Sequence, residues 1–282
     1  MDRFWLKSYP PGVPSDIDPS VYPSVVSLLE ESFAKYRDAK AYVCMDKALT
    51  FGEVDTLSQA LAAWLQSRGL KRGARVAIMM PNVLQYPVAI AAVLQAGFIA
   101  VNVNPLYTAP ELHHQLEDSG AEAVIVLENF ASTLQKAIAG TPVKHVVVAS
   151  VGDLMGFLKG NIINFVLRNV RKQIPAWSLP GHFRFNSVIA AGRSMRLARP
   201  DLGPQDVAVL QYTGGTTGVA KGATLTHRNM IANTLQSQAW LKAFLPPDLE
   251  QATVICALPL YHIFALTANC LLFVRLGWRN VL

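Results

Sequence analysis

The sequence predicts an α/β protein in which layered parallel or mixed sheets are flanked by helices, and three observations carry this prediction. Short apolar runs alternate with segments of helical length along much of the 282 residues, which is typical of parallel strands joined by helices. Runs such as 75–79 and 145–149 are rich in Val, Ile and Ala, which fits strands covered on both faces. The chain is 51% hydrophobic and only 16% charged, which excludes intrinsic disorder.

Chain length allows two domains or one large α/β domain. Residues 1–23 hold five prolines and little periodicity, so we expect an extended arm there. We expect a first α/β subdomain over 24–200, whose last part from 184 is a linker, and the beginning of a second α/β subdomain over 201–282.

Capping signals mark the helices of the first subdomain. Thr50 with Glu53 forms a capping box, Gly69 and Gly120 suit helix C-termini, and Pro110 suits a first helical position. The elements expected in order are a helix over 25–36, a strand over 41–45, a turn at 47–48, a helix over 51–68, a strand over 75–79, a helix over 83–96, a strand over 98–103, a helix over 110–119, a strand over 123–127, a helix over 131–139 and a strand over 145–149.

The mean hydropathy of +0.27 requires a test for membrane spans. The most apolar stretches, 87–101 and 263–274, are shorter than the roughly 20 residues of a spanning helix and contain polar residues, so we expect buried helices instead. The N-terminus lacks the apolar run of a signal peptide, which predicts a cytoplasmic protein.

The net charge of +6 is no signature of nucleic-acid binding, although it permits attraction to acidic lipid. Cys44, Cys256 and Cys270 are odd in number and lie among apolar residues, so we expect buried free thiols in a reducing compartment. The adjacent His113 and His114 face different sides of a helix, which argues against a shared metal ion.

Between 151 and 181 apolar residues recur at helical spacing, and four basic residues accompany them: Lys159, Arg168, Arg171 and Lys172. One interpretation is a surface helix that contacts acidic lipid, peripherally on the inner face of the cell membrane. The other, which we favour from the sequence, is an ordinary helix packed on the domain.

The most informative segment follows an expected strand over 207–212. Its glycines leave backbone N–H groups free to surround phosphate oxygens, its threonines supply hydroxyls that donate to phosphate or bind Mg²⁺, and its lysine supplies a positive charge. A helix from about 226 to 243 comes next. The residues concerned are Thr213, Gly214, Gly215, Thr216, Thr217, Gly218 and Lys221. The alternative is a Gly/Thr-rich surface loop without a ligand.

Two better-known phosphate loops are excluded by spacing. A Walker A loop needs Gly directly before the lysine, where this chain has Ala220. A dinucleotide fingerprint needs its first two glycines separated by one residue, whereas Gly214 and Gly215 are adjacent.

The segment 212–222, Tyr-Thr-Gly-Gly-Thr-Thr-Gly-Val-Ala-Lys-Gly, resembles the phosphate loop of the AMP-forming acyl-CoA synthetases, with Ala220 in place of the usual proline. The segments 49–53, 73–82, 97–105 and 257–262 also match recurring parts of that family. The nearest resemblance is to bacterial long-chain fatty-acyl-CoA synthetases. It implies that the chain is an incomplete N-terminal domain of an adenylate-forming enzyme.

The resemblance implies a substrate set of ATP, a fatty acid and coenzyme A, with acyl-AMP as the intermediate and Mg²⁺ as the metal. It places Thr213 to Lys221 on the β- and γ-phosphates, with Lys221 catalytic and Thr216 as the Mg²⁺ contact. His262 matches a histidine beside the adenylate. Candidates for an apolar acyl channel, weighed against a plain core role, are Trp240, Phe264 and Leu266.

Later family motifs do not occur before Leu282, so we expect little ligase activity from these 282 residues alone. The alternatives are an adenylate-forming ligase for another carboxylate, such as an aryl acid or an amino acid, and a non-catalytic module that binds nucleotide or membrane. The sequence predicts neither the acyl chain length nor the oligomeric state.

Overall fold

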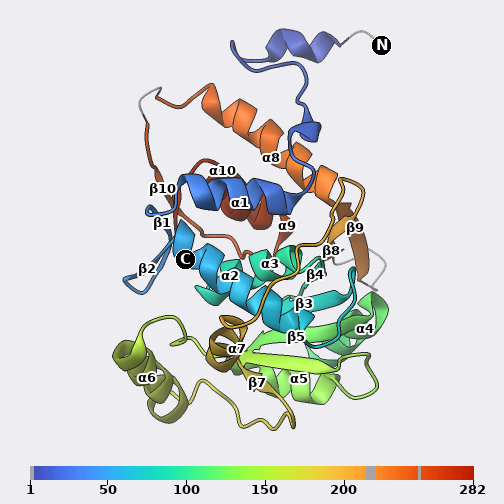
Figure 1. Ribbon diagram of the computed structural model, residues 1–282, viewed down its shortest axis with the longest axis vertical. Coiled ribbons are helices and arrows are strands. Elements are labelled where there is room, and N and C mark those ends of the chain that lie inside the picture. Colours follow the sequence, from blue (N-terminus) through green and yellow to red (C-terminus); the bar gives the residue numbers. More distant parts are fainter. Residues whose placement is uncertain (1–2, 214–219, 247–248) are drawn as a thin grey trace.

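The computed structural model describes residues 3–213, 220–246 and 249–282, and its strands form two sheets layered with helices (Figure 1). The larger sheet has seven strands, parallel except for the last pair. In spatial order they are β7 (Phe183–Arg184), β6 (His145–Ala149), β5 (Ala121–Leu127), β3 (Arg75–Met79), β4 (Ile99–Asn102), β8 (Val207–Thr213) and β9 (Lys221–Thr226).

The smaller sheet has four strands, and it joins the beginning of the chain to its end. In order they are β10 (Thr253–Ile255), β11 (Arg279–Val281), β1 (Lys40–Cys44) and β2 (Lys47–Thr50). The expectation of a turn at 47–48 is wrong, because Lys47 already pairs with Cys44. The turn lies at Met45 and Asp46, both of which have positive φ.

The two faces of the larger sheet bury different helices, because alternate residues of a strand point to opposite faces. Val76, Ile78 and Ile125 belong to a core shared with α1, α2, α3 and α7. Ala77, Met79 and Val124 belong to a core shared with α4 and α5. The helices are α1 (Val25–Lys35), α2 (Phe51–Gln66), α3 (Gln85–Gln95), α4 (Ala109–Ser119), η3 (Glu128–Phe130), α5 (Ala131–Ala137) and α7 (Phe185–Gly192).

Local signals set the helix ends. Thr50 caps α2, its hydroxyl accepting from the Glu53 amide while the Glu53 carboxylate accepts from the Thr50 amide. Gly120 ends α4 in the left-handed conformation, as expected, but the cap of that helix is Thr108, so Pro110 is its second residue rather than its first. The three cysteines are free and buried, as predicted.

The last third of the chain adds α8 (His227–Lys242) and a compact run of α9 (Ile263–Ala265), η5 (Leu266–Leu272) and α10 (Phe273–Arg275). Strands from both sides of residue 200 share each sheet, so the expected subdomains 24–200 and 201–282 do not correspond to separate sheets. Within the described residues, no helix is both long and apolar enough to cross a bilayer.

The N-terminal arm is not uniformly extended, because it contains two short 3-10 helices, η1 (Phe4–Ser8) and η2 (Pro19–Val21). It runs along α8, where Tyr9 contacts Trp240 with ring centroids 5.0 Å apart.

The segment after β6 departs most from expectation. It forms α6 (Phe157–Phe165), which continues into the π-helical η4 (Val166–Val170) at the border of the molecule (Figure 1). The helix packs on the domain, as expected, through the buried Gly160 and the partly buried Ile163, but most of its large apolar side chains are exposed, which was not expected.

Candidate functional site

The candidate phosphate loop connects the two antiparallel strands at one edge of the larger sheet. Thr213, the last residue of β8, pairs with Lys221, the first residue of β9, and both are exposed at the mouth of the loop. The loop residues Gly214, Gly215, Thr216, Thr217 and Gly218 lie outside the described residues. The exposed hydroxyl and ammonium groups at this mouth suit an anionic ligand.

Strand β9, which was not expected from the sequence, leads directly into α8, the helix expected from about 226. Thr226 caps this helix through a reciprocal pair of hydrogen bonds with Asn229. The next residue, His227, is buried, and its Nδ1 accepts a hydrogen bond of 3.1 Å from the Val25 amide. Burial lowers the pKa of His227 to about 4, so the ring is neutral and fastens α8 to α1.

Helix α4 supports the β8–β9 hairpin from the side. His114 Nε2 lies 3.3 Å from the carbonyl oxygen of Ala220, directly before Lys221. The Tyr212 hydroxyl donates to the Asp118 carboxylate. Burial, together with that carboxylate, raises the pKa of Tyr212 far above its usual range. Both ends of the loop are therefore held by α4.

Close contact within the hairpin explains one glycine. A Cβ on Gly222 would stand 2.9 Å from the Tyr212 ring, so only glycine lets the two strands meet there. His113, in contrast, contacts the carbonyl oxygen of Ala137 at 2.8 Å. The adjacent histidines 113 and 114 thus face different neighbours, as the sequence predicted.

Buried polar side chains connect the hairpin to the segment that contains His262. Asn102 Nδ2 donates to Gln211 Oε1 at 3.1 Å, and Gln211 Nε2 donates to the Tyr261 carbonyl oxygen at 3.2 Å. The Tyr86 hydroxyl lies 2.7 Å from Asn102 Oδ1 and 2.9 Å from the Leu260 carbonyl oxygen. We call Tyr86, Asn102 and Gln211 the buried polar network.

Asn82 fixes the same segment one step earlier. Its Nδ2 donates to the carbonyl oxygens of Cys256 and Leu258, and its Oδ1 accepts from the Leu260 amide at 2.8 Å. Three backbone groups of an irregular stretch are thereby satisfied by one side chain. The stretch before His262 consequently has a defined position relative to β3 and β8.

The other predicted site residues lie in different environments, some exposed and some buried. His262 is exposed at the start of α9, where its Nδ1 accepts from the Phe264 amide at 3.4 Å. Phe264 is exposed, Leu266 is buried in the core, and Trp240 lies on α8 against the N-terminal arm. His262 and Phe264 are therefore close neighbours, whereas Trp240 is held in a different environment.

Sequence reasoning missed the buried polar network and Asn82. A signal was present, since Asn102 and Gln211 interrupt strands that are otherwise apolar. A polar side chain in a buried strand needs a partner, because an unpaired one costs about 1–3 kcal/mol. The sequence does not show which residues supply the partners, because 109 residues separate Asn102 from Gln211.

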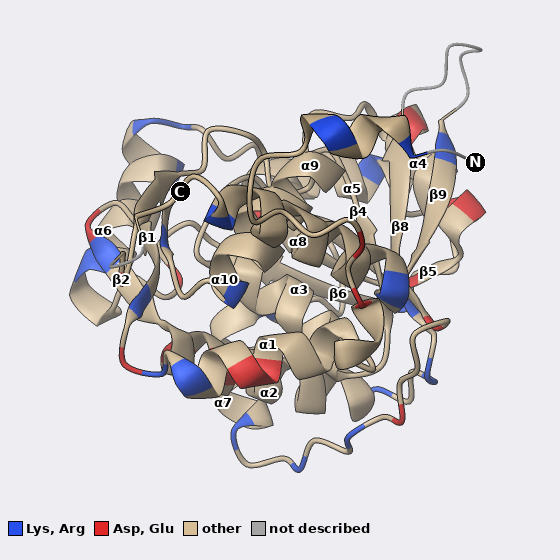
Figure 2. Ribbon diagram, turned by 90° about the horizontal axis from the view of Figure 1, so that it is seen from above, with Lys and Arg blue, Asp and Glu red and all other residues tan. Residues whose placement is uncertain are grey.

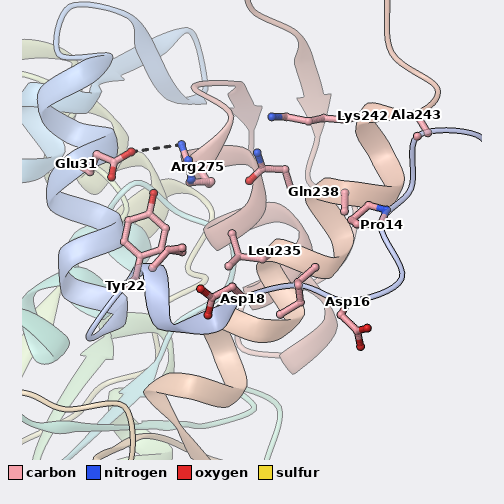
Figure 3. Close-up of a pocket in the computed structure, with 14 residues that line it drawn as sticks. Pro14, Asp16, Asp18, Tyr22, Glu31, Leu235, Gln238, Lys242, Ala243 and Arg275 are labelled. Carbon is pink, nitrogen blue, oxygen red and sulfur yellow. Dashed lines mark ion pairs between the residues drawn. The ribbon is translucent and has the colours of Figure 1, made fainter.

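A cavity of about 720 Å³ lies between the N-terminal arm, α8 and α10, and no described residue of the β8–β9 hairpin lines it (Figure 3). Arg275 points across it toward Glu31, 3.6 Å away, and Lys242 lies at its rim. Asp16 and Asp18 also line it. Acidic groups outnumber basic ones there, so this cavity is a poor match for phosphate.

A loop at the carboxyl end of a parallel strand is where open α/β sheets bind their ligands. The hairpin loop, its exposed lysine and the neighbouring 256–262 segment share that end of the sheet. The fold is therefore an open α/β sheet with an exposed hydroxyl and an exposed lysine at the end where such sheets bind their ligands.

Comparison with known proteins agrees. The model of the family described as AMP-binding enzyme matches residues 29–282. The long-chain-fatty-acid–CoA ligase of Escherichia coli O6:H1 is 51% identical over 100% of this chain and 50% of its own length. The ligase of the same description from Bacillus subtilis is 35% identical over 99% of this chain and 49% of its own length.

Solved structures share the fold. A long-chain-fatty-acid-CoA ligase from Archaeoglobus fulgidus superposes with a TM-score of 0.74 at 24% identity, over 97% of this chain and 49% of that one. The anthranilate CoA ligase AuaEII, in complex with anthranoyl-AMP, gives a TM-score of 0.75 at 21% identity, over 94% of this chain and 46% of that one. The chain belongs to the AMP-binding enzyme family, and it spans about half the length of the curated relatives it matches.

Proposed function

We propose that the protein to which this chain belongs is a long-chain fatty acid–CoA ligase. The observation that carries the proposal is the 51% identity, across the whole chain, with a ligase of that description. The two alternatives from the sequence are weaker. Structures with aryl acids in their names are about 20% identical, which supports the fold alone, and a purely binding module would not need the shared enzyme segments.

The proposed reaction has two steps. The fatty acid carboxylate attacks the α-phosphorus of ATP, which yields acyl-AMP and pyrophosphate. The thiol of coenzyme A then attacks the acyl carbon and releases AMP, which yields acyl-CoA. The protein must mainly position the reactants and balance the negative charge that moves onto pyrophosphate.

The hairpin supplies that balance in our proposal. Lys221 would contact the β- or γ-phosphate as a point charge, next to the hydroxyl of Thr213 and the backbone of 214–218. Mg²⁺, held in part by Thr216, would neutralise further charge on the triphosphate. Support from α4 keeps the loop ends in place, so little reorganisation is needed when ATP binds.

His262 would lie beside the adenylate, and its place at the start of α9 is set by Asn82 and the buried polar network. Phe264 and Leu266 would border the acyl chain from α9 and η5, and Trp240 would do so from α8. Because Leu266 is already in the core and Trp240 contacts the arm, we rank Phe264 first among the three.

Long-chain acids partition into bilayers, so an enzyme that uses them gains from working at a membrane. We propose a cytoplasmic protein with a peripheral contact on the inner face of the cell membrane.

The test joins this chain to the remaining half of the Escherichia coli relative and measures pyrophosphate release with a long-chain fatty acid, an aryl acid and an amino acid. We expect release with the fatty acid, and a loss of about 10²–10³ in rate for Lys221→Ala. Lys242→Ala, on the far end of α8, is the matched control. Faster pyrophosphate release with an aryl acid or an amino acid would contradict the proposed fatty acid substrate. Normal turnover by Lys221→Ala would contradict the proposed role of the loop.

A further inference from the structure

Helix α6 is attached to the domain through its small and polar side chains. Gly160 is so close to Gly152 that a Cβ there would stand 2.3 Å from the Gly152 carbonyl oxygen. One turn later, Asn164 Oδ1 accepts a hydrogen bond of 2.8 Å from the Gly152 amide. The inward side of the helix therefore carries Gly160, Asn164 and the partly buried Ile163, and its other large apolar side chains lie elsewhere.

Those side chains lie outside. Phe157 is 89% exposed and Phe165 is 60% exposed, and three further large apolar residues of the segment share this condition: Leu158, Ile162 and Val170. Residues 158, 162 and 165 follow helical spacing and form one face. Single exposed apolar residues are ordinary, but a contiguous group marks a surface that binds something apolar.

Three exposed cations accompany this face in the sequence. Lys159, Arg171 and Lys172 are exposed within or directly after it. The Lys159 ammonium also donates to the carbonyl oxygen of Met45, whose side chain is 52% exposed and extends the apolar surface onto the turn between β1 and β2.

Arg168, which the sequence grouped with these cations, has a different task. Its guanidinium donates to both carboxylate oxygens of the buried Glu128, at 2.8 to 3.1 Å, and its Nη2 also donates to Ser150 Oγ at 3.0 Å. Arg168 therefore anchors η4 to the ends of β5 and β6. The anchor holds the exposed face at a fixed position on the domain.

The positive surplus of the chain falls within the part of the sequence that contains this face, 154–200. Eight of the 25 Lys and Arg residues, and none of the 19 Asp and Glu residues, lie between 154 and 200. Outside that stretch acidic residues slightly outnumber basic ones, and the two signs are interspersed over the molecule (Figure 2). The positive surplus thus belongs to one segment.

We propose that the surface formed by residues 157–172, with Met45, docks on an anionic lipid bilayer. Its apolar side chains would enter the boundary between headgroups and acyl chains, while Lys159, Arg171 and Lys172 would meet lipid phosphates. A second copy of this chain would bring like charges together, and a nucleic acid would leave the aliphatic side chains in water. This surface is where we locate the membrane contact proposed above, and the inference does not depend on ligase activity.

The experiment is sedimentation of the 282-residue chain with vesicles of phosphatidylcholine alone, or of phosphatidylcholine mixed with phosphatidylglycerol, without ATP or coenzyme A. We compare a double variant, Phe157→Ser with Phe165→Ser, and a triple variant that changes Lys159, Arg171 and Lys172 to Gln. All five side chains are exposed, so the fold should survive, and thermal unfolding checks this. The controls are Phe244→Ser, also highly exposed, and a triple Gln variant of the exposed Lys7, Lys71 and Lys136.

We expect binding that depends on phosphatidylglycerol, a loss of about a hundredfold in the charge variant, a loss of at least about tenfold in the phenylalanine variant, and no change in either control. Equal binding by all five proteins, or no binding of the unchanged chain to acidic vesicles, would overturn the proposal. A dimer that dissociates in the phenylalanine variant without any lipid affinity would also overturn it, because the surface would then join two copies of the chain.

Discussion

The two edges of the seven-stranded sheet depart from the usual distribution of side chains, in which apolar groups are buried and polar groups are exposed. One edge buries polar groups, and the other exposes apolar ones. At the β8–β9 edge, amide and hydroxyl groups of Asn102, Gln211 and Tyr86 are buried and bonded to one another. At the β7 edge, the neighbouring α6 carries phenylalanine and leucine into solvent. Buried polar groups and exposed apolar patches are the informative exceptions in a soluble protein.

The difference indicates which kind of partner each edge is built for. Buried polar groups lose their hydrogen bonds to water, but a fully bonded network can hold a backbone segment in one position, as it does before His262. Exposed apolar groups are unfavourable in water, and a contiguous group of them marks a surface that a partner covers. In our proposals, one edge holds a backbone segment in position for a polar ligand, and the other edge contacts an extended apolar surface.

Cutting the buried polar network should have the largest effect on folding. Asn102→Leu leaves Gln211 Oε1 without its buried donor and leaves the Tyr86 hydroxyl with the Leu260 carbonyl oxygen alone, so we expect the free energy of unfolding to fall by about 4 kcal/mol. Denaturant titration measures it. The double variant with Gln211→Leu removes both partners and should lose less than the sum of the two single changes; additive losses would show that these residues act independently.

The two edges should respond to acid with opposite signs. His227, beside the hairpin, has a pKa lowered from 6.5 to about 4, because burial favours the neutral ring. Between these two values the unfolded chain binds a proton that the folded protein does not, so stability is lost as the pH falls from 6.5 toward 4. The loss should reach about 3 kcal/mol.

Unfolding measured at several pH values checks this for His227. In His227→Gln, whose side-chain oxygen can still accept from the Val25 amide, the decline between pH 6.5 and 4 should become shallower by that amount. The exposed His262→Gln serves as the comparison for loss of a histidine. An unchanged slope in His227→Gln would show that the ring is not held neutral.

Asp153, before α6, behaves in the other direction. Burial is the main reason that its pKa rises from 3.8 to about 6, so its charge weakens the folded state above pH 6 and this penalty fades as the pH falls toward 3.8. Asp153→Asn should therefore raise the free energy of unfolding at pH 7 by about 2 kcal/mol. The gain should vanish near pH 4, and Asp201→Asn should show none; a loss at pH 7 would mean that the carboxylate is needed as an acceptor for Ser150 and Asn186.

The attachment of α6 offers the smallest change in overall stability. Gly160→Ala places a methyl group against the Gly152 carbonyl oxygen, so we expect α6 to detach while the sheet remains folded. Protease cleavage within 157–172 should rise roughly tenfold with little change in the melting temperature. Gly203→Ala, where a Cβ meets its nearest atom at 3.8 Å, is the matched control; unchanged cleavage would contradict the close packing of α6.

Elements whose signals are local could be predicted from the sequence. The strand over 75–79 and the capped helices α2 and α8 occur where the apolar pattern and the caps placed them. Sheet order could not be predicted, because β1 pairs with β11 across more than 200 residues. The exposure of the apolar residues of α6 was missed for a physical reason: periodicity identifies a helix and its apolar face but does not reveal whether that face points toward the core.

The same holds for the candidate site. The loop motif could be singled out because its residue types and spacing carry a signal, whereas His262 was proposed from the resemblance of 257–262 to a family segment. Their supports, His114, Asp118 and Asn82, could not, because each acts through contacts with residues far away in the sequence.

The most direct test of the account is whether the two edges work separately. In the chain joined to the second half of the Escherichia coli relative, acyl-AMP formation and binding to phosphatidylglycerol vesicles are measured for Lys221→Ala and for Phe157→Ser with Phe165→Ser. We predict that the lysine variant loses acyl-AMP formation and keeps vesicle binding, and that the phenylalanine variant does the reverse when the acid is supplied in soluble form. Loss of both properties in either variant would contradict the division.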